Sequence, residues 1–337
     1  MPSFRSLGDL STSFLLNRQT ANLKFEIQRR STELSTGITA DISAALRGDF
    51  RAIAAIESGL SLAKTDRLAI AEAQSYASAA QVALDVVQNR ADASARVLLQ
   101  VPDVPTQPTL DRAAREIRQA FEAVVGALNE KTADRAIFAG DMTDGTALAA
   151  VDTMLADLEL AIVGQTTAAG VAAAVDAWFD TPGIGFDVLG YTGSDVSLAP
   201  FRLGSGETTS FQAKASDPEF REMMKGLAMG ALLTSPSFVS SISEKVELSR
   251  TAAERVLTAQ GWITDVQATI GAGEAAAATA QSRTANEATA LQLARVDLIG
   301  ADPFEAATKL ENAQVQLETL FALTARVSRL SLVDFLR

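Results

Sequence analysis

Few side chains in this sequence could carry out acid–base or metal chemistry. The 337 residues include neither histidine nor cysteine, which excludes the usual general base near neutral pH, thiolate nucleophiles, disulfides and thiolate metal sites. Catalysis would have to use paired carboxylates, lysine or tyrosine. We therefore predict that the chain is not an enzyme, and that it has no catalytic, cofactor-binding or metal-binding residues.

Two acidic segments are the remaining candidates for such chemistry. Asp141-Met142-Thr143-Asp144-Gly145 is similar to the start of a calcium loop, but the acidic ligand at the third position and the later bidentate glutamate are missing. Glu219 and Glu222 would share one helix face. Acidic residues interact favourably with the first turn of a helix, which explains this pair without catalysis. We expect an exposed loop and a solvated helix start.

Glycine pairs and tryptophans give two further candidate sites. Gly183-Ile184-Gly185 and Gly204-Ser205-Gly206 have neither the Lys-Ser/Thr of a phosphate loop nor a full dinucleotide fingerprint, so turns are expected there. Trp178-Phe179 and Trp262 would either mark a ligand pocket or fill the local core of alanine-rich helices. The second reading is the prediction.

Charge and hydropathy restrict the partners. Lys and Arg number 29 against 41 Asp and Glu, for a formal net charge of -12. Nucleic-acid binding is not expected, because phosphate backbones need a basic surface. The sequence has no stretch of about 18 apolar residues, so no membrane insertion is predicted. The N-terminus lacks the apolar core and cleavage site of a secretory signal peptide. These rules alone would place the protein in the cytoplasm.

Proline and charge divide the chain into helical ends and a punctuated middle. No proline lies between Pro2 and Pro102, and only Pro303 follows Pro236. Because proline breaks helix interiors, both ends can form long helices. A further helix is expected over roughly 109–138, and short helices over 148–163 and 168–179. Phe186–Leu189 and Ser210–Ala213 are expected to be short β-like runs. Residues 141–235 contain 4 basic and 13 acidic side chains, which suits a solvated outer surface.

Apolar periodicity at both ends predicts helix seams that pack against other helices. Asp302-Pro303 predicts the start of the last helix, since aspartate caps the free N–H groups and proline fits the first turn. The spacing near both termini is coiled-coil-like. One monomer cannot bury both sides of these apolar stripes, so neighbouring subunits must cover the rest. The apolar C-terminus must also be covered. We predict an assembly interface formed by Leu16, Leu23, Ile27, Leu34, Leu310, Leu317, Leu320, Val327, Leu330, Leu332 and Phe335.

Three segments, in order along the chain, resemble motifs of the bacterial flagellin family. The first runs from Ser11 to Gly37 and ends in Glu33-Leu34-Ser35-Thr36-Gly37. The second is Ala136–Thr143, similar to the family's "yiFaGt-t" segment. The third is Leu310–Glu318, continuing to Leu330–Leu336, which is similar to the "LSLldyL" end of hook–filament junction members. Where the family often has a Ser-Asp-Asp-Pro-like loop, this chain has Ile38–Ala44 without proline.

The resemblance implies a structural adaptor that joins the flagellar hook to the filament through self-assembly of its terminal helices. It also implies export through the flagellar type III channel without signal cleavage, to the extracellular flagellum. The implied partners are copies of the chain, neighbouring hook-associated and flagellin subunits, and a flagellar export chaperone. A filament-forming flagellin is the alternative within the family.

The expected fold is mainly α: an elongated rod of long antiparallel, coiled-coil-like helices from both chain ends, with a smaller mixed α/β domain inserted in the middle. The predicted divisions are a terminal helical domain (1–44 and 300–337), a helical rod domain (45–140 and 236–299) and an acidic outer domain (141–235). Two other classes stay open. A coiled-coil signalling protein would need heptads throughout, and a hydrolase without histidine would need a cleft with paired acids.

Overall fold

The computed structural model describes the backbone of residues 7–335 and the side chains of residue 11 and residues 14–326. The chain divides into two units. We call residues 1–64 and 285–337 the terminal unit, and residues 65–284 the central unit. The long helices α3 and α8 contribute to both.

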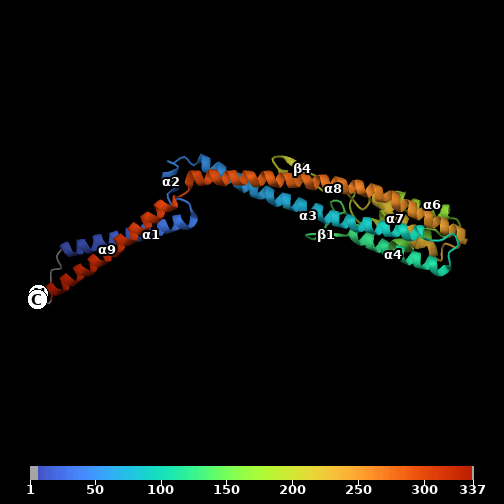
Figure 1. Cartoon of the computed structure of the whole chain (residues 1–337), viewed down its shortest axis with the longest axis horizontal. Helices are drawn as coiled ribbons and strands as arrows, with labels where there is room; N and C mark the ends of the chain where they lie inside the picture. The colour runs from blue at the N-terminus through green and yellow to red at the C-terminus, as the bar shows by residue number, and fades with distance from the viewer. Residues whose placement is uncertain (1–6, 336–337) are drawn as a thin grey trace. The chain divides into compact units, whose positions relative to one another are not determined.

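Long α-helices dominate both units, which confirms the mainly α prediction (Figure 1). The elements in chain order are α1 (Leu7–Thr36), α2 (Ile42–Ala45), α3 (Arg51–Leu99), α4 (Gln107–Leu128), β1 (Lys131–Thr132), β2 (Arg135–Ala136), α5 (Val151–Ala161), α6 (Ala168–Asp180), the π-helical turn η1 (Phe186–Gly190), β3 (Phe201–Gly204), β4 (Glu207–Thr209), α7 (Pro218–Ala231), the 3-10 turn η2 (Leu232–Thr234), α8 (Ile242–Ile299) and α9 (Pro303–Phe335). No described helix is both long and apolar enough to cross a lipid bilayer.

In the terminal unit, α1 and α9 lie side by side (Figure 1). The Ala301 N–H donates to the Gly37 carbonyl at 2.9 Å, and the Thr39 N–H donates to the Ile299 carbonyl at 2.9 Å. These bonds join the end of α1 to the start of α9, so the two helices run antiparallel. The predicted start of α9 is confirmed, because the Asp302 carboxylate accepts from the N–H groups of Phe304 and Glu305.

In the central unit, α3 and α8 are joined along their length by side-chain bonds to backbone carbonyls. Gln81 donates to the Gln267 carbonyl, and Gln88 to the Gln260 carbonyl, each at 2.9 Å. The facing surfaces are rich in small residues, which lets the two backbones approach closely. Buried alanines on these helices include Ala73, Ala77, Ala80, Ala91, Ala252, Ala259, Ala277 and Ala280.

Helices α4 and α7 pack against each other and complete this core. The Tyr76 hydroxyl donates to the Ile137 carbonyl at 2.5 Å, and its ring lies 5.3 Å from that of Phe201 and 5.6 Å from that of Phe211. Burial raises the pKa of Tyr76 to about 12. Residues of the 141–235 segment therefore share one apolar core with α3 and α8.

The segment after α4 corrects one prediction. A helix was expected over roughly 109–138, but α4 ends at Leu128, and residues 131–136 form the antiparallel β1–β2 hairpin. Ala133 and Asp134, both at positive φ, form its turn. The helix-like spacing of Ile137 and Phe138 instead reflects their burial after the hairpin.

Residues 186–213 correct two more predictions. Phe186–Leu189 was expected to be β-like and forms the π-helical turn η1. Ser210–Ala213 was also expected to be β-like, but the paired strands are β3 and β4, directly before it. In contrast, the short helices expected over 148–163 and 168–179 are present as α5 and α6.

Candidate assembly interface

The α1–α9 pair buries one continuous stripe on α9. The side chains of Ala306, Ala313 and Leu320 are buried, and those of Leu310 and Leu317 are half-buried between them. These positions alternate in steps of four and three, the spacing of a coiled-coil seam. Leu310, Leu317 and Leu320, all predicted from the sequence, therefore belong to one seam.

The matching stripe on α1 contains Leu16, Thr20, Leu23, Ile27 and Arg30, all half-buried. Three of the four predicted residues of α1 thus lie on the seam. The fourth, Leu34, is 37% exposed. The side chains of Val327, Leu330, Leu332 and Phe335 lie outside the described residues. Whether other chains contact these positions stays a prediction.

Large apolar side chains are exposed outside the seam on the same two helices. Phe14, Leu15 and Phe25 are exposed on α1, and Phe304, Val315, Phe321 and Leu323 are exposed on α9. Phe25 is 69% exposed and Phe304 is 82% exposed. Phe14 and Phe25 are eleven residues apart, as are Phe304 and Val315. Because eleven residues make almost three full turns, each pair lies on one helix face.

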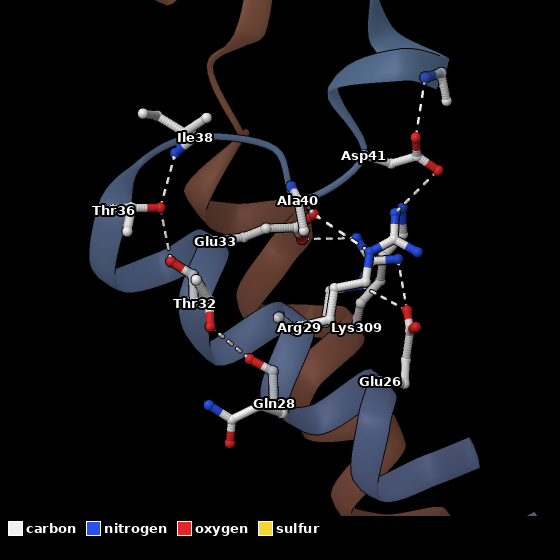
Figure 2. A network of polar contacts seen from close by, with 12 residues as sticks. Glu26, Gln28, Arg29, Thr32, Glu33, Thr36, Ile38, Ala40, Asp41 and Lys309 are labelled. Atoms are coloured by element: carbon white, nitrogen blue, oxygen red, sulfur yellow. Dashed lines mark hydrogen bonds and ion pairs between the residues drawn. The ribbon is translucent and has the colours of Figure 1, made fainter.

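A buried carboxylate fixes the turn at the end of α1, and sequence reasoning missed it. The Glu33 side chain is only 3% exposed and accepts from the Ala40 N–H at 2.9 Å and from Arg30 at 2.7 Å. Arg30 also pairs with Glu26 at 2.6 Å. Figure 2 shows this network with Arg29 and Asp41, whose charged groups lie 3.7 Å apart. Apolar periodicity carried no signal for this burial, because Glu33 lies beside the Leu16–Leu34 seam and not on it.

The two partners of Glu33 determine its ionisation. Burial alone would raise the pKa of the Glu33 carboxyl, but the Ala40 N–H and the Arg30 guanidinium together hold it below its usual value. The hydrogen bond to Glu33 correspondingly raises the pKa of Arg30. Gly37, at φ +67, ends α1 in the left-handed conformation, and its N–H donates to the Glu33 carbonyl at 2.8 Å.

The glycine candidates form turns, as predicted. Gly204, Ser205 and Gly206, all at positive φ, connect β3 to β4. Gly183 and Gly185 are also at positive φ, before η1. Among the side chains that the structure describes, no group of three or more histidine, cysteine, aspartate or glutamate residues could hold a metal ion.

Glu219 and Glu222, the predicted acidic pair, have different environments. Glu222 is largely buried and binds Arg255 at 2.9 Å and Lys225 at 3.4 Å, as part of an ion network that joins α7 to α6 and α8. Glu219 lies in the first turn of α7. The prediction of a solvated pair is therefore right for the helix start and wrong for Glu222.

The two tryptophan candidates, Trp178 and Trp262, also differ in burial. Trp178 is buried against Phe179 and Phe186, and its indole N–H donates to Asp157 at 2.6 Å. Trp262 is 43% exposed on α8. The core-filling prediction therefore holds for Trp178 and is wrong for Trp262.

The second motif segment is tightly held around Gly140. Its φ is +66, and a Cβ there would lie 2.3 Å from the Ser194 carbonyl oxygen. The flanking residues bond to the same loop, since the Ser194 N–H donates to the Ala139 carbonyl and the Asp141 N–H to the Val196 carbonyl. Only glycine fits this position.

Comparison with known proteins identifies the C-terminal helices. Residues 254–336, which cover most of α8 and nearly all of α9, match the family model of the bacterial flagellin C-terminal helical region. This part of the chain is similar to bacterial flagellins. The matched segment contains the whole described α9 seam and the exposed apolar side chains of α9, whereas those of α1 lie outside it.

A solved structure has the same fold. It is described as "putative flagellar hook-associated protein from Vibrio parahaemolyticus", and it matches with a TM-score of 0.51 at 13% identity, covering 75% of this chain and 100% of that chain. At this identity the likeness concerns the fold alone. No curated protein matches the sequence.

Proposed function

We propose that this chain belongs to the flagellin family and is a structural adaptor of the bacterial flagellum that joins hook to filament. The observation that carries the proposal is the α1–α9 pair, which covers one face of each helix and leaves Phe14, Phe25, Phe304 and Val315 in solvent. Apolar stripes of this kind are costly in water and are typical of helices that pack against further chains.

The adaptor role is favoured over a filament role by two observations. The C-terminal Leu330–Leu336 is similar to the end of hook–filament junction members, and the fold matches a structure described as a flagellar hook-associated protein. A filament-forming flagellin is the second candidate. The matched C-terminal helical region supports it equally, since the family model is that of flagellin itself.

The proposed partners follow from this role. Copies of the chain cover the exposed stripes of α1 and α9, and neighbouring hook-associated and flagellin subunits cover those at the edges of the layer. A flagellar chaperone shields the same stripes before assembly. Export uses the flagellar type III channel without a cleaved signal peptide, and the protein functions outside the cell.

Deleting the gene tests the proposal. We expect electron microscopy of the mutant to show hooks without filaments, with flagellin released into the medium and motility lost. Re-expression of the gene from a plasmid is the control. Intact filaments, or loss of one filament type only, would favour a filament-forming or accessory subunit instead.

A further inference from the structure

A groove in the central unit lies outside the candidate assembly interface. One wall is formed by residues 210–214 and the start of α7, and the other by α8. Its volume is about 450 Å³. A second hollow of about 380 Å³ continues it along α8, and the two share Pro218, Glu219, Val266 and Thr269. We call the two hollows together the α7–α8 groove.

A segment outside the described helices and strands, with free backbone groups, lines this groove. Ser210–Ala213 follows β4 without joining the sheet. Phe211 is buried, whereas Ser210 and Gln212 are exposed. In the described part of the chain, no hydrogen bond involves the backbone N–H or C=O groups of these four residues. Such a segment can pair with an extended peptide, which adds as a further strand.

The second hollow of the α7–α8 groove contains two carboxylates and no lysine or arginine. Glu219 and Asp265 line it, and neither forms an ion pair with any described residue. Lys214 also lines the groove, but its ammonium group donates to the Asp195 carbonyl at 2.8 Å. Two unpaired carboxylates favour a cationic side chain in the groove.

Trp262 lies in the second hollow, together with both carboxylates. It is 43% exposed, although an indole ring is one of the most favourable side chains to bury. A lysine or arginine placed on an indole face gains a cation–π attraction in addition to its attraction to the carboxylates. The exposed ring therefore fits the same kind of occupant as the charge does.

We propose that the α7–α8 groove binds an extended segment of another protein that carries arginine or lysine side chains. The segment pairs with the backbone of Ser210–Ala213 and places a cation against Trp262, Glu219 and Asp265. A second copy of this chain is a poorer occupant, because the chain as a whole is acidic, with a formal net charge of -12. The proposal concerns a different surface from the terminal helices and does not depend on the proposed function.

The test uses the full-length chain and a capped hexapeptide of alternating valine and arginine. We expect saturable binding by calorimetry, with a change in tryptophan fluorescence that is absent in Trp262→Phe. The double variant Glu219→Gln with Asp265→Asn should bind about tenfold more weakly. The matched control is Glu116→Gln with Glu254→Gln, which removes two exposed carboxylates outside the groove and should bind as the wild type does.

Two further peptides separate charge from backbone pairing. A peptide with glutamate in place of arginine should not bind. One with alternate amides N-methylated should bind at least about tenfold more weakly, because it cannot donate to the free backbone carbonyls of Ser210–Ala213. Equal binding by the two double variants, or full binding by the N-methylated peptide, would overturn the proposal. Concentration-dependent self-association of the wild type, abolished in the Glu219/Asp265 variant, would also overturn the proposal. The occupant of the groove would then be a second copy of the chain.

Discussion

The carboxylate of Glu33 accepts a hydrogen bond from the Ala40 N–H, seven residues further along the chain and beyond the end of α1. Arg30 binds the other oxygen of the same carboxylate at 2.7 Å. This arrangement ties the last turn of α1 to the loop that leads into α2. It thereby sets the direction in which the chain leaves the helix that carries half of the candidate interface.

Replacing Glu33 with glutamine should loosen this turn. Glutamine retains an acceptor but removes the charge that Arg30 binds, and a hydrogen bond to a charged group contributes about 1.5–3 kcal/mol. We expect the Ala40 amide to exchange with solvent about tenfold faster or more. Glu26→Gln is the control, because Glu26 is more exposed and should have a smaller effect. Unchanged exchange at Ala40 would show that the carboxylate does not hold the turn.

The same bond should depend on pH. The pKa of Glu33 is lowered in the folded chain, so its contribution to stability is complete above the unfolded pKa of about 4.3 and is lost as pH falls through the folded value. Protection of the Ala40 amide, corrected for the intrinsic exchange rate, should therefore be constant from neutral pH to about 5 and fall below about 4. Glu33→Gln should lack this step. A loss of protection between pH 7 and 5 in the wild type would contradict the assignment.

The seam of α9 should be essential for assembly. Replacing Leu317 and Leu320 with aspartate would bury unpaired charge between α1 and α9. We expect assembly to be abolished, while the central unit unfolds at an unchanged temperature in calorimetry. Leu160→Asp is the control, since Leu160 is exposed on α5 of the central unit. Normal assembly of the Leu317/Leu320 variant would show that this seam is not required.

The uncovered faces should be needed for assembly but not for the α1–α9 pair. Phe25→Ser with Phe304→Ser removes two of the most exposed rings in the terminal unit and leaves the seam unchanged. We expect the variant to be secreted and to fail to incorporate into flagella, as judged by immunoblots of sheared flagella and of the medium. Incorporation at the wild-type level would mean that these faces do not contact other chains.

Limited proteolysis should distinguish the two units in the purified subunit. The terminal helices lack a cover on one face, so cleavage should trim both ends and leave a resistant core near residues 45–295. Mass spectrometry of the fragments gives the boundaries. Ends that resist cleavage as well as the central unit does would count against an interface completed only by neighbouring chains.

The helical fold was predictable from prolines and apolar spacing, because both act locally. Asp302 and Pro303 specify the start of α9 without reference to any other part of the chain. The hairpin after α4 was missed, since Ile137 and Phe138 continue the helical spacing although they are buried for another reason. The burial of Glu33 depends on partners before and after it in the chain, and apolar periodicity assigns no seam position to a charged residue.

The groove was unpredictable for a different reason. Trp262 was expected to fill a core, because the sequence indicates that an aromatic lies on an alanine-rich helix but not which face the helix buries. The free edge of Ser210–Ala213 likewise depends on where β3 and β4 stop pairing. Both features arise from tertiary packing.

Immunogold electron microscopy of intact flagella, with antibodies against the central unit, tests the adaptor role most directly. The account predicts label at a single position on each flagellum, between hook and filament, and none in the deletion strain. Label along the whole filament would contradict the adaptor role and identify the chain as a filament-forming flagellin.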